Sequence, residues 1–275
     1  MNWCKIKMTK HRSADLVQRS LMFLYLGLLI LLPIAAITVA SLENGVTALW
    51  ENITTRQALF ALRLTLTTAT IMMVINVVMG TLTAYVLVRY DFFGKSVVNA
   101  LIDLPFAIPT VVTGIMLVIL YGPNSVLGSF LSRNGIQVIF DKPGIIFALL
   151  FVTYPFVVRA VQPVLQNLSP DTADAARTLG ASSLRIFFKV TLPALIPAIL
   201  TGAALSFSRA IGEFGSIVVV SGNIPLKSQV AAVYIYGELE SNNSQGAMGL
   251  SVVLLLISFL ILIVLNFLQH RRERD

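Results

Sequence analysis

Six long apolar segments alternate with shorter polar segments along the chain. Each segment has about 18 to 26 residues, and an α-helix needs about 20 to cross the hydrocarbon core of a bilayer. The pattern therefore predicts an all-α polytopic membrane protein with six transmembrane helices. The expected spans are 20–40, 62–87, 101–121, 145–165, 190–211 and 250–267.

The first apolar segment, 20–40, could also be a cleaved secretory signal, because Thr38-Val39-Ala40 is compatible with a cleavage site. The apolar core of a signal usually has about 7 to 15 residues, and this segment is longer. We therefore expect it to remain in the protein as the first transmembrane helix.

The composition supports a membrane protein that contacts the lipid bilayer. Of 275 residues, 56% are hydrophobic and only 12% are charged, which is far more apolar than a soluble domain. The net charge of +7 would suit nucleic-acid binding, but the basic residues are scattered over loops and chain ends, so no nucleic-acid partner is expected. The single cysteine, Cys4, excludes an internal disulfide. His11 and His270 have no metal-ligand spacing around them, so we expect no metal site.

Basic residues are distributed unevenly between alternate loops, and short basic loops usually stay in the cytoplasm. The bias predicts that both termini and the polar loop 166–190 are cytoplasmic. The larger set comprises Lys5, Lys7, Lys10, Arg12, Arg19, Arg89, Lys95, Arg159, Arg177, Arg185, Lys189, Arg271, Arg272 and Arg274. The smaller set, on the opposite side, comprises Arg56, Arg63, Arg133, Lys142 and Lys227.

The same pattern divides the chain into four parts. A basic cytoplasmic segment, 1–19, precedes the first transmembrane helix and its outer loop, 20–61. A core of five transmembrane helices, 62–267, contains the cytoplasmic loop 166–190. A cytoplasmic tail, 268–275, ends the chain.

The polar interval 169–193, between the fourth and fifth spans, has the sequence of two capped helices. Ser169 suits the N-cap of the first helix, and Gly180 suits the left-handed residue that ends it. Ser182 or Ser183 can cap a second, basic helix that leads into the fifth span. Two interpretations are open: an ordinary amphipathic connector, or a lever through which another protein moves two spans.

The spacing of residues in this interval resembles the EAA loop of ABC importer permeases, whose pattern is E-A-A-x3-G-x9-I-x-L-P. Here Asp174 replaces the glutamate and Val190 replaces the isoleucine. In that family the loop is a coupling helix that docks into a groove on a separate ATPase subunit. The resemblance therefore implies an ATPase-coupling role for Asp174, Ala175, Ala176, Gly180, Val190, Leu192 and Pro193.

Two prolines of the third span, Pro105 and Pro109, are four residues apart. On a continuous helix they share one face, and each leaves a backbone carbonyl that neighbours or water must satisfy. That face is either a packing kink or part of an aqueous path. In the fourth span we expect Arg159 to extend its charge to the cytoplasmic surface.

The end of the fifth span carries two opposite charges, Arg209 and Glu213, which share a face if the helix continues that far. Charges at this depth should face the bundle interior or water. In one interpretation they only pair with each other. In the other, Arg209 and the hydroxyls of Ser206 and Ser208 bind a passing anion, and Glu213 holds the guanidinium when the path is empty. The candidate path residues are therefore Pro105, Pro109, Ser206, Ser208, Arg209 and Glu213.

A wider resemblance, over about 62–267, is to the sulfate/molybdate branch of these permeases, and within it to the sulfate/thiosulfate permeases. It rests on Asp103-Leu104-Pro105-Phe106, on the segment around Arg159, on 209–215 and on Ser221-Gly222-Asn223-Ile224-Pro225. The resemblance implies the type I (MetI-like) permease fold and ATP-driven transport of sulfate or thiosulfate into the cytoplasm.

The resemblance also implies the partners. They are a second, related permease subunit, two ATPase subunits that bind ATP and Mg, and an extracytoplasmic sulfate-binding protein. The outer loop 221–247 either touches that binding protein or is a plain solvated loop. The chain itself is expected to have no cofactor and no enzymatic activity, because no phosphate-binding loop, catalytic triad or metal cluster is found. The membrane is a bacterial inner membrane or a plastid envelope.

Two alternatives stay open. In the first, the importer carries molybdate or tungstate. In the second, the chain is a secondary anion transporter that needs no ATPase. Inverted repeats and intramembrane carboxylate sites are expected for that class, and neither is clear in the sequence.

Overall fold

The computed structural model describes residues 18–272. Within this range every regular element is a helix, which confirms the all-α membrane fold expected from the apolar pattern. Residues 1–17 and 273–275 lie outside the described range. The cytoplasmic placement of the basic segment 1–19 and of the tail 268–275 therefore stays a prediction.

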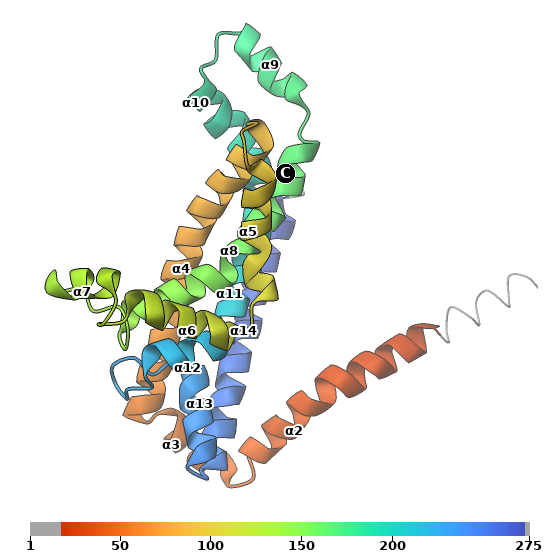
Figure 1. Ribbon diagram of the computed structural model, residues 1–275. Helices are drawn as coiled ribbons and strands as arrows, with labels where there is room; N and C mark the ends of the chain where they lie inside the picture. The colour runs from red at the N-terminus through yellow and green to blue at the C-terminus, as the bar shows by residue number, and fades with distance from the viewer. Residues whose placement is uncertain (1–17, 273–275) are drawn as a thin grey trace, which may run out of the picture.

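Among residues 18–272, five helices are long and apolar enough to cross a membrane, and a sixth crossing results if two shorter helices form one broken span. The five are Gln18–Ser41, α4 (Arg56–Arg89), α8 (Lys142–Asn167), Ser183–Ile211 and Ser244–Leu265. The first includes η1 (Gly27–Leu31) and α2 (Leu32–Ser41), and the fourth is made of α10 (Ser183–Ile186), η2 (Phe187–Thr191) and α11 (Leu192–Ile211). The fifth lies within α14 (Ser244–Arg272). Helices α4, α8, α11 and α14 form one bundle (Figure 1).

The expected third span is not one continuous helix. It consists of α5 (Lys95–Ala107) and α6 (Thr110–Tyr121), which are bent by 113° relative to each other. Pro109 explains the break, because the residue before a proline avoids the helical conformation, and Ile108 is extended with φ −86° and ψ 128°. The prediction that Pro105 shares a helix face with Pro109 is therefore wrong: Pro105 lies inside α5, and Pro109 precedes α6.

Small residues allow α4, α8 and α11 to pack closely. Gly80 of α4 and Gly202 of α11 both face Val157 of α8, where an added Cβ would come within 2.9 Å and 2.8 Å of that residue. A buried hydrogen bond of 2.8 Å from Asn76 Nδ2 to Thr153 Oγ1 joins α4 to α8. Gly80 and Val157 each lie four residues after Asn76 and Thr153, the pair that also joins α4 to α8. The two helices therefore run parallel.

The bundle has α9 (Pro170–Thr178) at one end and α13 (Ala231–Glu240) at the other (Figure 1). The interpretation of 221–247 as a plain solvated loop is wrong. α13 packs against α4 and α14, and the N–H of Ala231 donates to Thr65 Oγ1 at 2.8 Å. The remaining short helices are α3 (Gly45–Ile53), α7 (Val126–Arg133) and α12 (Gly215–Ser221).

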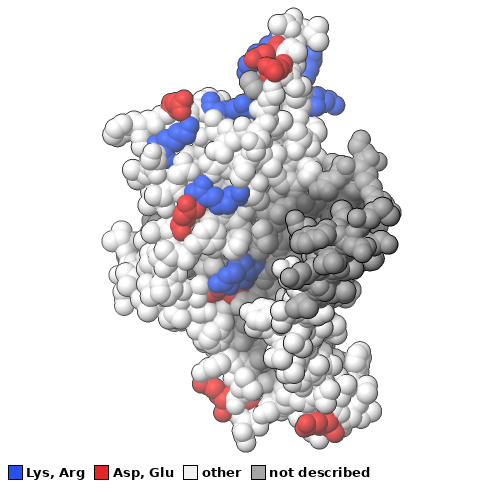
Figure 2. Space-filling model, turned by 90° about the vertical axis from the view of Figure 1, so that its right-hand side faces the viewer, with Lys and Arg blue, Asp and Glu red and all other residues white. Residues whose placement is uncertain are grey.

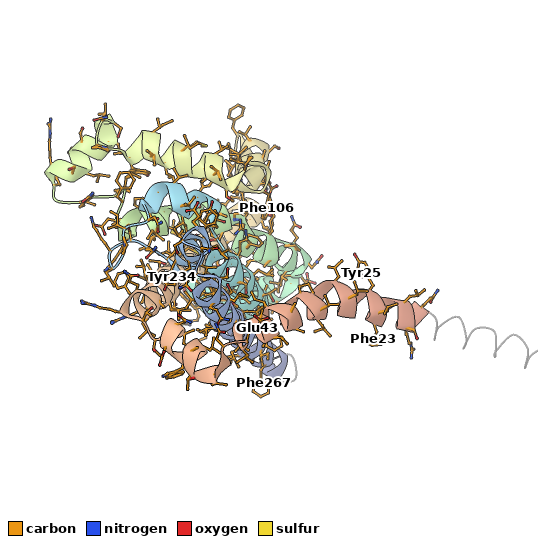
Figure 3. The ribbon with its side chains drawn as sticks, turned by 90° about the horizontal axis from the view of Figure 1, so that it is seen from below. Phe23, Tyr25, Glu43, Phe106, Tyr234 and Phe267 are labelled. Carbon is orange, nitrogen blue, oxygen red and sulfur yellow. The ribbon has the colours of Figure 1, made fainter. Side chains whose placement is uncertain are left out.

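The N-terminal helix, Gln18–Ser41, reaches away from the bundle (Figures 1 and 3). Its last part, α2, contacts α14, but none of its most apolar stretch is buried. Phe23 and Tyr25 are 67% and 65% exposed and lie far from the other helices (Figure 3). These side chains are therefore available to lipid or to another subunit.

Arg159 joins α8 to α5 through a polar network. Its Nε and Nη2 donate to the two carboxylate oxygens of Asp103 at 2.7 Å and 2.6 Å. Nη2 also donates to the Asn99 carbonyl at 2.9 Å, and Nη1 donates to the side chains of Asn99 and Gln162. All five N–H donors are thus used. The prediction that Arg159 only extends to the surface is wrong, because these groups on α5 and α8 satisfy it. We call Asn99, Asp103, Arg159 and Gln162 the Arg159 clasp.

Replacing Asp103 with alanine should lower the apparent melting temperature of the purified protein more than Asp91→Ala. Each change removes the carboxylate partner of a basic side chain, but Asp91 is fully exposed and pairs with Lys95 one turn away, whereas Asp103 connects two helices. Loss of a two-bond, half-exposed charged contact costs about 1 to 2 kcal/mol. Equal melting temperatures for the two variants in the same detergent would contradict this role of the clasp.

Candidate functional site

Helix α9 has the capped structure expected from the sequence. Ser169 is its N-cap, and the hydroxyl oxygen accepts the N–H of Asp171 at 3.2 Å. Gly180 adopts φ +83°, and its N–H donates to the Arg177 carbonyl at 2.9 Å. The N–H of the next residue donates to the Ala176 carbonyl at 3.0 Å. The two bonds form a Schellman motif, which ends the helix at a defined residue.

Helices α9 and α10 project beyond the bundle (Figure 1), and acidic and basic side chains gather at this projection (Figure 2). Asp174, Ala175 and Gly180 are exposed, whereas Ala176 is half-buried. Asp174 forms an exposed ion pair with Arg177, with 2.7 Å between Oδ1 and Nη1. One face of α9 is therefore accessible to another protein.

Three large apolar side chains next to α9 are also exposed. Leu179, Leu184 and Phe188 are 88%, 72% and 58% exposed. Sequence reasoning missed them, although apolar residues inside a polar interval were a usable signal. Exposed apolar side chains that project beyond a bundle are typical of a protein-binding surface. We call Asp174, Ala175, Gly180, Leu179, Leu184 and Phe188 the α9 surface.

The remaining residues of the spacing motif lie within the fifth span. The chain is helical from Ser183 to Ile211, so the span begins before the expected start at Val190. Val190 and Leu192 are half-buried, and Pro193 is exposed in the first turn of α11. Because no flexible linker separates α10 from α11, a displacement of α10 acts directly on the span.

Arg209 and Glu213 form an ion pair, with 2.6 Å between Nη1 and Oε2. Helix α11 ends at Ile211, so Glu213 reaches Arg209 from beyond the helix. Glu213 is only 1% exposed, and its Oε1 accepts the N–H and the hydroxyl of Ser216, both at 2.9 Å. Two hydrogen bonds and the ion pair therefore offset the lost solvation of this buried carboxylate.

Arg209 has donors that the structure leaves unused. Its side chain is 35% exposed, and within residues 18–272 it contacts Glu213 through one nitrogen. A guanidinium has five N–H donors, and Arg159 uses all of its own in the clasp. Of these two arginines, Arg209 is the one that can bind an anion without losing an existing contact.

The two serines of the candidate path are placed differently. Ser206 is fully buried, and its hydroxyl donates to the Ala203 carbonyl at 3.0 Å. Ser208 is half-buried, and its hydroxyl has no hydrogen-bonding partner in the described part of the chain. Residues two positions apart on an α-helix point in directions that differ by about 200°, so the two serines face opposite sides of α11. Ser208 therefore has the hydroxyl that a ligand can use.

The break in the third span lies beside the helix that anchors the ion pair. Gly114 of α6 faces the carbonyl of Ser216 in α12, and an added Cβ would come within 2.7 Å of it. Because Ser216 also holds Glu213, α6, which begins after Pro109, packs against the support of that carboxylate. Pro105 lies on the other side of the break, within α5.

Known proteins resemble this chain over most of its length. Residues 76–275 match the family described as "Binding-protein-dependent transport system inner membrane component". A relative from Synechocystis sp., named sulfate transport system permease protein CysT, is 44% identical over 251 residues, 91% of this chain and 88% of its own length. The protein of the same name from Escherichia coli (strain K12) is 40% identical over 251 residues, 91% of each chain.

Solved structures share the fold. A chain from the crystal structure of a bacterial ABC transporter involved in the import of the acidic polysaccharide alginate matches with a TM-score of 0.76 at 17% identity, over 98% of both chains. A chain of the MetNI methionine ABC transporter in an inward facing conformation matches with a TM-score of 0.59 at 16% identity, over 80% of this chain and 99% of its own.

The family match includes the long helices α8, α11 and α14, together with the α9 surface and Arg209. The structural matches give the same MetI-like arrangement of helices. This multi-pass membrane protein therefore belongs to the family of binding-protein-dependent transport system inner membrane components.

Proposed function

We propose that this chain is the membrane-spanning subunit of an ATP-driven importer that moves sulfate or thiosulfate into the cytoplasm. The α9 surface carries the proposal, because an exposed, capped helix between two spans is suited to receive movement from another protein. The 44% and 40% identical relatives are named sulfate transport system permease proteins, which supports sulfate as the cargo.

In this proposal ATP and Mg bind to two separate ATPase subunits, and the α9 surface docks on one of them. Leu179, Leu184 and Phe188 supply apolar contact area, and the small side chain of Ala175 permits close approach. Movement of the ATPase acts on α8, which two residues separate from α9, and on the span that begins with α10. The bias of basic residues supports a cytoplasmic position for both termini and for α9.

A second, related permease subunit covers part of the N-terminal helix and completes the path. The exposed Phe23 and Tyr25 support such a partner, because they contact nothing in the bundle (Figure 3). An extracytoplasmic binding protein delivers the anion at the α13 end. The membrane is a bacterial inner membrane, and a plastid envelope is the alternative.

Arg209 binds the anion as it passes, and Ser208, the residue before it, offers its hydroxyl as an additional donor on α11. An oxyanion needs positive charge and N–H or O–H donors, and no acid-base chemistry. Glu213 takes the guanidinium when the path is empty. Ser216 keeps Glu213 hydrogen-bonded while Arg209 turns to the anion.

The Arg159 clasp connects the movement of the ATPase subunits to the Arg209 site. It moves α5 together with α8, and the break at Pro109 passes the movement to α6 and then to α12. Because α12 holds Glu213 through Ser216, a shift of α12 changes how strongly Glu213 competes with the anion for Arg209.

Replacing Gly180 with leucine should reduce ATP-driven sulfate uptake at least about tenfold while ATP hydrolysis continues. Gly180 has φ +83°, and a leucine there costs about 1 to 2 kcal/mol of backbone strain that unwinds the end of α9. Gly94→Leu is the matched control: Gly94 has φ +84°, and an added Cβ meets no atom within 4 Å at either position. Uptake and phosphate release are measured in proteoliposomes with all subunits present. Equal effects of the two changes would count against the docking role of α9.

Replacing Arg209 with glutamine should reduce sulfate uptake by at least about tenfold, because the anion loses the charged, bidentate guanidinium group that binds it. Arg209→Lys should give an intermediate rate, since lysine keeps the charge without the bidentate geometry. Arg56→Gln, which removes an exposed charge at the start of α4, should leave uptake unchanged. Normal uptake by the Arg209→Gln variant would exclude the anion role.

Competition and subunit omission decide between the remaining classes of transporter. We expect unlabelled thiosulfate to compete with labelled sulfate, and molybdate and tungstate to compete at least about tenfold less well. Omitting the ATPase subunits should stop uptake. Uptake without them would identify a secondary transporter, and preferential competition by molybdate would identify the other oxyanion class.

A further inference from the structure

A cavity of about 480 Å³ opens between α4 and α8 towards the α13 end of the bundle. Its lining residues all belong to these two helices, and none of them is a residue of the α9 surface, of the Arg159 clasp or of the Arg209 site. Two cations, Arg63 and Lys142, lie at its wall, and apolar side chains form most of the remainder. The transport proposal assigns no role to this cavity.

The packing of α4 and α8 places the two cations at one level. The helices run parallel, and residues that face each other are 77 positions apart, as in the Asn76–Thr153 hydrogen bond. Lys142 is therefore level with a position only two residues, or about 3 Å, from Arg63. The distance from this level to the opposite ends of both helices is about 38 Å. A bilayer measures about 40 to 45 Å between its two headgroup surfaces, which is close to this distance.

The charge of both cations is uncompensated. Neither Arg63 nor Lys142 forms an ion pair with a residue in the range 18–272. The neighbouring carboxylate, Asp141, is engaged elsewhere: Oδ1 accepts the N–H of Lys142 at 2.7 Å, and Oδ2 lies 3.5 Å from Lys227 Nζ. The cavity thus offers two cationic groups at headgroup depth and no carboxylate among its lining residues.

The apolar part of the cavity lies deeper in the membrane than the cations. Ile71 is eight residues, or about 12 Å, further along α4 than Arg63, and Ile146 is about 6 Å further along α8 than Lys142. A free oxyanion would gain nothing from these side chains. A zwitterionic lipid would bring its own cation towards the second basic group. The arrangement fits a molecule with an anionic head and a hydrocarbon tail.

We propose that this cavity binds an anionic phospholipid. Arg63 and Lys142 hold its phosphate, and an acyl chain lies along Leu64, Ile71 and Ile146. The bound lipid occupies a crevice between α4 and α8, two helices that carry the core of the bundle, in the leaflet opposite α9.

The test is native mass spectrometry of the assembled transporter, titrated with dioleoyl phosphatidylglycerol or dioleoyl phosphatidylcholine. We expect the wild type to bind phosphatidylglycerol at least about tenfold more tightly than phosphatidylcholine. Arg63→Gln with Lys142→Gln should remove that preference, because each cation near a headgroup contributes on the order of a severalfold change in affinity. Arg56→Gln with Arg133→Gln removes the same charge from residues outside the cavity and should retain it.

Three results would overturn the proposal. The first is equal binding of the two lipids by the wild type, a comparison that needs no variant to fold. The second is loss of the preference in Arg63→Lys with Lys142→Arg, which keeps both charges. The third is displacement of phosphatidylglycerol by millimolar inorganic sulfate, which would make the cavity a site for free anions. Uptake measurements do not enter this test, so its failure would leave the transport proposal unaffected.

Discussion

The charged contact between Arg159 of α8 and Asp103 of α5 holds the first half of the broken span against the bundle. α5 has only 13 residues before the chain turns by 113°. In a membrane, apolar packing between helices is a weak constraint, because lipid tails are as apolar as the side chains. A bidentate ion pair with additional amide partners is directional, so it holds α5 against α8 in one orientation.

The positions of the two arginine–carboxylate pairs suggest how one end of the protein can influence the other. Arg159 has all its donors satisfied, which suits a fixed mechanical link between two helices. Arg209 has one partner and several free donors, which suits a site that exchanges partners. The broken span lies between them: α5 is held by the clasp, and α6 packs on α12, whose Ser216 holds Glu213. The same residue type therefore has a structural role at one site and a proposed binding role at the other.

Local features of the fold were predictable because they depend on neighbouring residues. The long apolar runs, the N-cap at Ser169 and the left-handed Gly180 all follow from sequence within a few positions. The break before Pro109 is also a local feature, because proline disfavours the helical conformation of the residue before it. The apolar run continues across the break, so length and hydrophobicity alone predict one continuous helix there.

Contacts between distant segments were not predictable from spacing. Arg159 and Asp103 are 56 residues apart, and nothing in their local sequence indicates that α5 and α8 meet there. The same holds for Thr65, whose hydroxyl caps the start of α13 across 166 residues. The pairing of Arg209 with Glu213 was accessible because four residues separate them, whereas the anchoring by Ser216 requires the turn that follows α11.

Cross-linking of the α9 surface to the ATPase tests the central claim most directly. In a Cys4→Ser background, single cysteines replace Leu179, which is 88% exposed beside α9, or Val126, which is 90% exposed on α7 away from the α9 end (Figure 1). The assembled transporter is then treated with a bifunctional thiol reagent. Our account predicts that Leu179→Cys cross-links to the ATPase subunit and that Val126→Cys does not. Cross-linking at Val126 alone, or at neither position, would contradict it.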